Sequence, residues 1–212
     1  MDFSVIVTGV LEENCYIVYD KAGTCVIIDP GDDSEAIADN ISENDLTPKA
    51  ILLTHGHFDH TGAVVALKER YESLPVYIHY DDRKMLSEPE QQGTFDFGVN
   101  DEFEADRYIE DGEKLRFGTL EFTVIHTPGH TKGSCCFLCD GTLFSGDTLF
   151  KGSVGRVDLP GGSESTMRKT LREKIAPLPD FLTVHPGHGD FTTMAEEKAE
   201  NPYIREALSD ID

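Results

Sequence analysis

The sequence lacks any apolar run approaching the roughly 20 residues that a membrane-spanning helix requires, and it does not open on a basic segment followed by an apolar one. We therefore expect neither a membrane partner nor a secretory leader, and we predict a cytoplasmic protein. Basic residues are also scarce, because 18 lysines and arginines stand against 40 aspartates and glutamates, giving a formal net charge of -22. Such a surface repels phosphate backbones, so we expect no nucleic-acid partner.

Cysteines are few and odd in number, which argues against a disulfide framework in a chain without an expected leader. Cys136 and Cys139 have the spacing of half a zinc site, but they lie in a strand-like run. Residues three apart on a strand face opposite sides of the sheet, so the two thiols would not bind one ion together. We interpret all five cysteines as core residues: Cys15, Cys25, Cys135, Cys136 and Cys139.

Short apolar runs between turn signals predict a chain rich in strands. The expected strands are 4–7, 16–19, 24–28, 50–53, 76–79, 107–109, 114–117, 120–125, 134–138, 142–145 and 181–184. The expected helices are 33–44 with Ser34 as N-cap, 61–71, 81–87, 163–175 with Ser163 as N-cap, and 195–208 with a break near Pro202. Strands in consecutive runs, with helices in both halves, predict two sheets flanked by helices rather than a doubly wound sheet.

Residues 88–106 have no clear period and contain Pro89, Gly93 and Gly98, which is typical of a long excursion. This segment either covers a site or joins a dimer, so the oligomeric state stays open. The chain has no linker rich in glycine, serine or proline, and its length suits one hydrophobic core. We predict a single domain over residues 1–212.

Residues of the types that bind metals gather where strands are expected to end. His55 and His57 stand two apart in an extended loop, so both imidazoles can face one ion, while Asp59 and His60 follow within reach of a second. Three more candidates follow later strands: His130, Asp147 and His188. One such residue is commonly only a turn or capping residue, but four within six positions are not expected by chance. Imidazole and carboxylate ligands suit zinc, iron or manganese, and ligand type alone does not choose among them.

The segment Thr54-His55-Gly56-His57-Phe58-Asp59-His60 resembles the signature of the metallo-β-lactamase superfamily, and segments 127–134, 145–150 and 186–189 resemble its later motifs. The resemblance implies an α/β (α+β) fold, an αββα sandwich of two mixed sheets flanked by helices, with metals at one edge between the sheets. It implies two divalent metal ions, Zn²⁺ in the first place with Fe or Mn as alternatives. The implied ligands are His55, His57 and His130 for the first ion, Asp59, His60 and His188 for the second, and Asp147 as a bridge.

The same resemblance implies a hydrolase whose two ions hold a hydroxide as the nucleophile. Asp59 is then the catalytic residue that orients the hydroxide and handles its proton. No Gly-x-Ser-x-Gly segment offers a serine nucleophile instead. Segment 149–163 and the Asn201-Pro202-Tyr203 ending resemble short glyoxalase-II-like hydrolases, which cleave thioesters such as S-lactoylglutathione. The long glyoxalases II hold glutathione with a helical extension, whereas only a short tail follows His188 here, so the thiol carrier stays open.

Arg156 is the first candidate substrate-binding residue, because its guanidinium can hold a carboxylate bidentately, and Lys151 is a weaker candidate. The competing interpretation is an ion pair between Arg156 and Asp158. We therefore expect a small-molecule anionic thioester as the partner. Lactone hydrolysis at the same site, a mononuclear iron persulfide dioxygenase and a non-catalytic metal-binding protein remain alternatives. β-Lactam hydrolysis is not expected as the native role, because the best-known β-lactamases carry cysteine where this chain has Asp147.

Four other polar residues lie near strand ends without matching a ligand position. We interpret His126 and His185 as hydrogen-bonded structural histidines, and His79 as a surface or packing residue remote from the motifs. Asp29 is either a carboxylate that orients a ligand histidine or part of an Asp-Pro-Gly turn.

Overall fold

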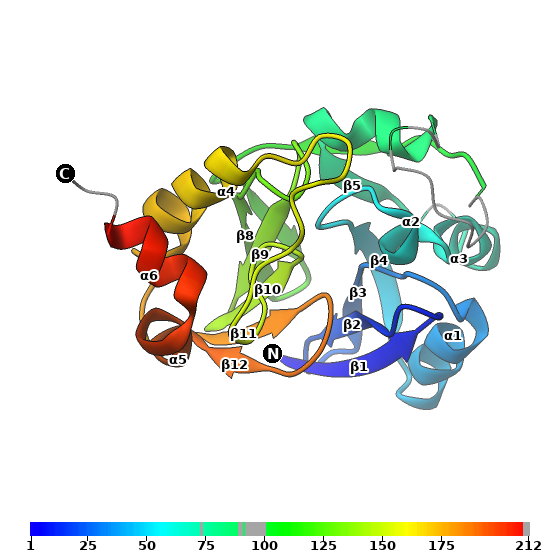
Figure 1. Cartoon of the computed structure of the whole chain (residues 1–212). Helices are drawn as coiled ribbons and strands as arrows, with labels where there is room; N and C mark the ends of the chain where they lie inside the picture. Colours follow the sequence, from blue (N-terminus) through cyan, green and yellow to red (C-terminus); the bar gives the residue numbers. More distant parts are fainter. Residues whose placement is uncertain (73, 89–90, 92–100, 210–212) are drawn as a thin grey trace.

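A computed structural model describes residues 1–72, 74–88, 91 and 101–209 of the chain. Two six-stranded sheets pack face to face, with helices on the outer side of each (Figure 1). This is the αββα sandwich that the sequence predicts. The described helices include none that is long and apolar enough to span a membrane.

The first sheet follows the chain order, with antiparallel pairing at its start and parallel pairing afterwards. Its strands are β1 (Asp2–Thr8), β2 (Glu13–Tyr19), β3 (Thr24–Ile28), β4 (Thr47–Leu52), β5 (Val76–His79) and β6 (Arg107–Ile109). Crossovers through α1 (Ser34–Glu43), and through α2 (Phe58–Thr61) and α3 (Val64–Arg70), make the parallel pairs possible. The short 3₁₀ helix η1 (Tyr80–Leu86) follows β5.

The second sheet is antiparallel except where β10 pairs with β11. Its strands are β7 (Lys114–Phe117), β8 (Leu120–His126), β9 (Cys135–Cys139), β10 (Thr142–Gly146), β11 (Thr183–Pro186) and β12 (Thr192–Thr193). The parallel pair is joined through α4 (Glu164–Thr170) and the π-helical turn η3 (Leu171–Ile175). Helices α5 (Met194–Glu200) and α6 (Pro202–Ser209) complete this side.

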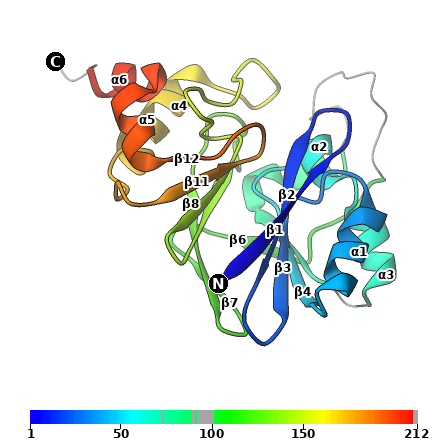
Figure 2. The same ribbon diagram turned by 90° about the horizontal axis from the view of Figure 1, so that it is seen from below.

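The core has three layers because side chains alternate across each strand. In β3, Val26 and Ile28 face the other sheet, where they meet Phe122 and Phe137, whereas Ile27 faces the helices. The outer layers lie under α1 and α3 on one side and under α4, α5 and α6 on the other (Figure 2). All five cysteines are buried and free, as predicted.

Several sequence-based predictions are wrong in detail. The N-cap of α1 is Asp33 in the left-handed conformation, with φ of 51°, and not Ser34. The helix expected over 61–71 is the shorter α3, Val64–Arg70, and the separate helix α2 precedes it. The strand expected over 181–184 begins only at Thr183, leaving Phe181 exposed. The predicted excursion over 88–106 lies largely outside the described residues.

Candidate metal centre

The seven predicted ligands come together at one end of the sandwich, from both sheets. His55 and His57 lie in the loop after β4 of the first sheet, and Asp59 and His60 lie in α2, which follows that loop. The remaining three follow β8, β10 and β11 of the second sheet: His130, Asp147 and His188. Parallel and neighbouring strand ends bring these loops to one edge, which is where irregular backbone is free to present side chains.

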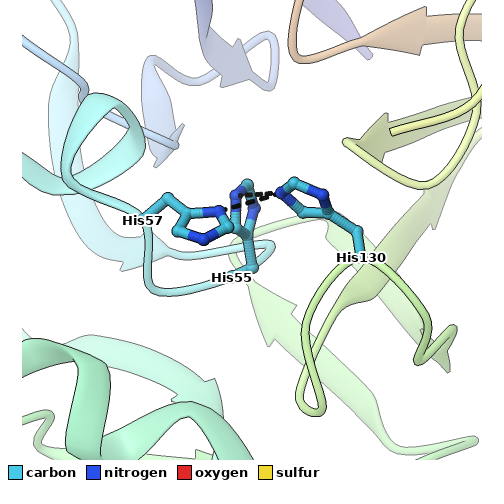
Figure 3. A group of neighbouring side chains, drawn as sticks. All are labelled: His55, His57 and His130. Atoms are coloured by element: carbon cyan, nitrogen blue, oxygen red, sulfur yellow. Dashed lines mark hydrogen bonds between the residues drawn. The ribbon is translucent and has the colours of Figure 1, made fainter. Parts of the chain in front are cut away.

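The first group of candidate ligands is the triad His55, His57 and His130 (Figure 3). His57 Nδ1 lies 2.9 Å from His130 Nε2, which in turn lies 3.3 Å from His55 Nε2. All three residues are almost completely buried. Burial lowers the pKa of His57 to about 3, so its imidazole is neutral at physiological pH. A neutral imidazole is the form that binds a metal ion.

The second group is the triad Asp59, His60 and His188. Asp59 Oδ2 lies 3.3 Å from His188 Nε2 and 3.8 Å from His60 Nε2. Asp147 stands between the two groups, because its Oδ2 is 3.4 Å from His130 Nε2 and its Oδ1 is 3.4 Å from His60 Nε2. One carboxylate with an oxygen directed at each triad is the arrangement of a ligand that bridges two ions.

The chemistry of this group fits divalent metal ions. Among the described residues, the buried His60 Nε2 and Asp147 Oδ1 have no hydrogen-bond partner. Unsatisfied buried polar atoms are costly, and a shared cation would satisfy both. Burial lowers the pKa of His60, but Asp147 and Asp59 outweigh it and raise that pKa well above its ordinary value. The carboxylates thus already favour a positive charge at this position, which a metal ion would supply in place of a proton.

Two buried carboxylates that are not candidate ligands lie beside His60. Asp29 Oδ2 lies 3.0 Å from His60 Nδ1, and the same side chain accepts hydrogen bonds from the backbone and hydroxyl of Thr54. The sequence left two interpretations open for Asp29. These contacts support the first, a carboxylate that orients a ligand histidine. Glu13 Oε1 lies 3.9 Å from the same imidazole nitrogen and is fully buried. Sequence reasoning missed Glu13, because a single glutamate at a strand start carries no local signal.

The loop that carries His188 is fixed by contacts across the sandwich. Asn14 and Tyr16 of β2 both donate to the carbonyl of Pro186, and His188 Nδ1 lies 3.1 Å from the carbonyl of Leu11. Gly187 leaves room for this packing, since a Cβ there would lie 2.5 Å from Asp147 Oδ1. Residues of the first sheet and its adjoining loop thus fix the position of His188, a candidate ligand that follows a strand of the second sheet.

A cleft of about 700 Å³ lies over the two triads. It is lined by candidate ligands together with Leu11, Phe58, Phe150, Ser153, Val154, Arg156 and Leu159. Arg156 lines the cleft but also makes two hydrogen bonds of 2.7 and 2.8 Å to Asp158. Lys151 lies 3.3 Å from Asp190 on the surface and is not among the residues that line the cleft.

The other histidines are not brought into the two triads. His126 Nε2 lies 2.9 Å from the carbonyl of Lys132, and His185 Nε2 lies 3.2 Å from Thr183 Oγ1, as expected for structural histidines. His79 was expected to lie far from the motifs, but its ring stacks on that of His126 at a centroid distance of 3.9 Å. The reason is that β5 and β8 belong to different sheets whose ends meet at this edge.

Comparison with known proteins agrees with this geometry. The family model of the metallo-β-lactamase superfamily matches residues 8–188. The chain belongs to the metallo-β-lactamase superfamily. Within this superfamily it is 36% identical to the hydroxyacylglutathione hydrolase GloC of Haemophilus influenzae, over 96% of this chain and 98% of the relative.

Two solved structures show the same fold over nearly the whole chain. The BLEG-1 B3 metallo-β-lactamase is 39% identical and superposes with a TM-score of 0.90, covering 96% of this chain and 99% of its own. TTHA1623, in a di-iron-bound form, is 40% identical with a TM-score of 0.83, covering 94% of this chain and 99% of its own. The superfamily and the His/Asp clusters point to divalent metals in a hydrolase.

Proposed function

We propose that this protein is a two-metal hydrolase that cleaves a small thioester, an acyl group joined to a thiol carrier. The position of Asp147 is the observation that carries the proposal. Its two carboxylate oxygens lie beneath an open cleft, one 3.4 Å from His60 Nε2 of the second triad and the other 3.4 Å from His130 Nε2 of the first. The likeness to GloC, whose name is that of a hydroxyacylglutathione hydrolase, supports the substrate class. Zn²⁺ is the proposed metal, with iron as the alternative that the di-iron form of TTHA1623 supports.

Two divalent ions, when bound, would supply an activated water and polarise the thioester carbonyl. In the proposed mechanism, Asp59 accepts a proton from the attacking water and passes it to the sulfur of the departing thiol carrier. Its side chain is 15% exposed and lines the cleft, so it reaches both the His188 imidazole and the solvent side. The leaving thiolate needs little help, since the pKa of an ordinary thiol is only about 8.5. The site accordingly requires no separate general acid.

The walls of the cleft support a substrate with an apolar part and an acidic part. Leu11, Phe58 and Phe150 provide apolar surface near the triads, and Arg156 provides a cation at the rim. The volume of about 700 Å³ lies within the usual range for small-molecule sites. We propose Arg156 as the residue that meets the substrate carboxylate, with Lys151 as a more distant candidate.

Metal analysis combined with a substrate panel tests the proposal. The protein is purified with its metals, the ions per chain are counted, and hydrolysis of S-lactoylglutathione, an acyl-coenzyme A and a simple lactone is measured. We expect two ions per chain and a kcat/KM for at least one thioester well above that for the lactone. One iron per chain together with persulfide-dependent oxygen uptake would show a dioxygenase instead.

β-Lactam hydrolysis is the second candidate, favoured by the 39% identity to BLEG-1. A cephalosporin is therefore included in the same panel. A kcat/KM for the cephalosporin that exceeds those of all the thioesters would replace the thioester proposal with an antibiotic-hydrolysing function. The Asp59→Asn variant serves as the matched control, because it removes the proposed proton acceptor and should suppress either hydrolysis.

A further inference from the structure

Asp82 is a buried carboxylate on η1 that lies beside the centre but belongs to neither triad. It is 1% exposed and accepts three hydrogen bonds. Its Oδ1 accepts from the backbone of Gly133 at 2.6 Å, and its Oδ2 accepts from the Thr131 hydroxyl at 2.6 Å and the backbone of Gly56 at 3.3 Å. A buried carboxylate with several donors around it is held firmly and holds its donors equally firmly.

The three donors belong to the two loops that carry the first triad. Gly56 lies between His55 and His57, and Thr131 follows His130 directly. The first loop comes from the first sheet and the second loop from the second sheet, so the triad closes only if the two loops keep a fixed separation. The backbone bond from Cys135 to Thr54, at 2.8 Å, also crosses this gap, but it lies farther along the chain from His130.

The loops are closely packed against Asp82 and the rest of η1. A Cβ on Gly133 would lie 2.7 Å from Asp82 Cγ, and a Cβ on Gly56 would lie 2.7 Å from the Met85 Cβ of the same helix. Both loops therefore carry glycine where they touch η1, and the backbone approaches the carboxylate directly. This contact fixes loop positions to within the small tolerance of close packing.

We propose that Asp82 is a positioning residue for the first metal ion, because it ties the His55–His57 loop to the His130 loop. In the second triad, His60 has a separate orienting carboxylate in Asp29, whose Oδ2 lies 3.0 Å from His60 Nδ1. Loss of Asp82 should therefore weaken the first ion selectively. The inference rests on the proposed two-metal centre but not on the thioester as substrate.

The test measures metal affinity rather than enzymatic activity. Apo-protein is titrated with Zn²⁺ in competition with a chromophoric chelator, for the parent, Asp82→Asn and Asp82→Ala. Loss of a residue that orients metal ligands typically costs about 10–100-fold in affinity. We expect a loss in that range for one ion in Asp82→Ala and a smaller loss in Asp82→Asn, whose amide oxygen still accepts one bond. The other ion should keep its affinity within about twofold.

Two reference backgrounds assign the affected ion. His188→Ala removes a ligand of the second triad, and His130→Ala removes one of the first. Adding Asp82→Ala to the His188→Ala chain should weaken the ion that remains, whereas adding it to the His130→Ala chain should have no further effect. Equal losses in both backgrounds would show a general structural role and overturn the proposal.

Asp20 supplies the matched control. It is also a buried carboxylate, and it accepts from the backbone of Ala22, Thr24 and Thr119 at the opposite end of the sandwich. Asp20→Asn should lower stability and leave both metal affinities unchanged. The proposal fails if Asp82→Ala binds both ions like the parent, or if Asp20→Asn weakens an ion as strongly.

A second pair of variants keeps the test decisive if Asp82→Ala does not fold. Thr131→Val removes the hydroxyl that Asp82 accepts from, and Thr131→Ser retains it. We expect Thr131→Val to weaken the first ion and Thr131→Ser to bind it like the parent. Parent-like zinc affinity in the folded valine variant would contradict the proposal.

Discussion

At the scale of single residues, Asp158 and the proposed substrate carboxylate would compete for Arg156. Its guanidinium is held bidentately by Asp158, and both side chains are more than half exposed. The guanidinium holds the pKa of Asp158 down at about 2, so the ion pair persists at any pH of enzymatic interest. A substrate carboxylate in the cleft would share the guanidinium with Asp158 or displace it. Exposed ion pairs contribute little to stability, so such an exchange costs little.

Substitution of Arg156 and substitution of Asp158 should change KM in opposite directions. Arg156→Ala should raise the KM for an anionic thioester about 5–10-fold with little change in kcat, because a charge-assisted contact is lost in ground and transition states alike. Asp158→Asn should lower that KM, because it removes the Asp158 carboxylate that competes with the substrate for the guanidinium. Steady-state kinetics with an anionic and an uncharged thioester provide the measurement. If the uncharged substrate responds equally to Arg156→Ala, the residue acts through loop structure rather than through charge.

At the scale of elements, the strands and the first motif could be predicted because their signals are local. The alternation in β8 and the turn before β10 predict their bounds to within about a residue, and Ser163 does cap α4. The ligands between His55 and His60 are equally local. They stand within six positions of one another in the sequence.

Contacts between the sheets were beyond prediction, because single residues far apart in sequence make them. Asp82 meets donors that are 26, 49 and 51 positions away, and nothing near Asp82 in the sequence distinguishes it from an ordinary surface acid. The N-cap of α1 was predicted at Ser34 instead of Asp33 for another reason. The Asp33 side chain makes no capping hydrogen bond and instead accepts one at 3.0 Å from the backbone of Gly9, which lies 24 positions away in the sequence.

Strand β11 contains a histidine whose titration should be visible in stability. His185 is 6% exposed and packs edge-on against Phe3 and beside Phe191, with ring centroids 4.8 and 4.3 Å away. Burial lowers the pKa of His185 from 6.5 to about 4. Between these values the unfolded chain binds a proton that the folded chain does not, so stability falls as pH decreases from 6.5 toward 4.

The His185→Phe variant should remove this part of the pH dependence. The parent should lose about 1.5 kcal/mol of unfolding free energy between pH 6.5 and pH 5 from this group. The variant cannot take up the proton and should show a shallower slope over that range. Urea unfolding of metal-free parent and variant at a series of pH values measures the difference, since the metal ligands titrate alike in both. Parallel curves would mean that His185 has an ordinary pKa in the fold.

At the scale of the whole molecule, the two sheets meet around the candidate ions. Four of the seven candidate ligands follow β4 of the first sheet, in the next loop and in α2, and three lie in loops that follow strands of the second sheet. Bound ions would therefore join the two halves of the sandwich across their shared edge. The formal net charge of -22 makes bound cations still more favourable, because they offset repulsion among acidic groups.

Removal of the metals should accordingly destabilise the whole sandwich. A ligand present at about 1,000 times its Kd adds about 4 kcal/mol to unfolding free energy, and for a domain of this size each kcal/mol corresponds to about 2–4 °C in Tm. We expect a strong chelator to lower Tm by at least about 8 °C, and Zn²⁺ to restore it. The measurement is a thermal melt at each step, with the metal content of the same samples determined in parallel. His188→Ala should show a smaller shift, because only the first triad stays complete. An unchanged Tm in samples shown to have lost their metals would mean that the ions bind the unfolded chain equally well and do not join the two sheets.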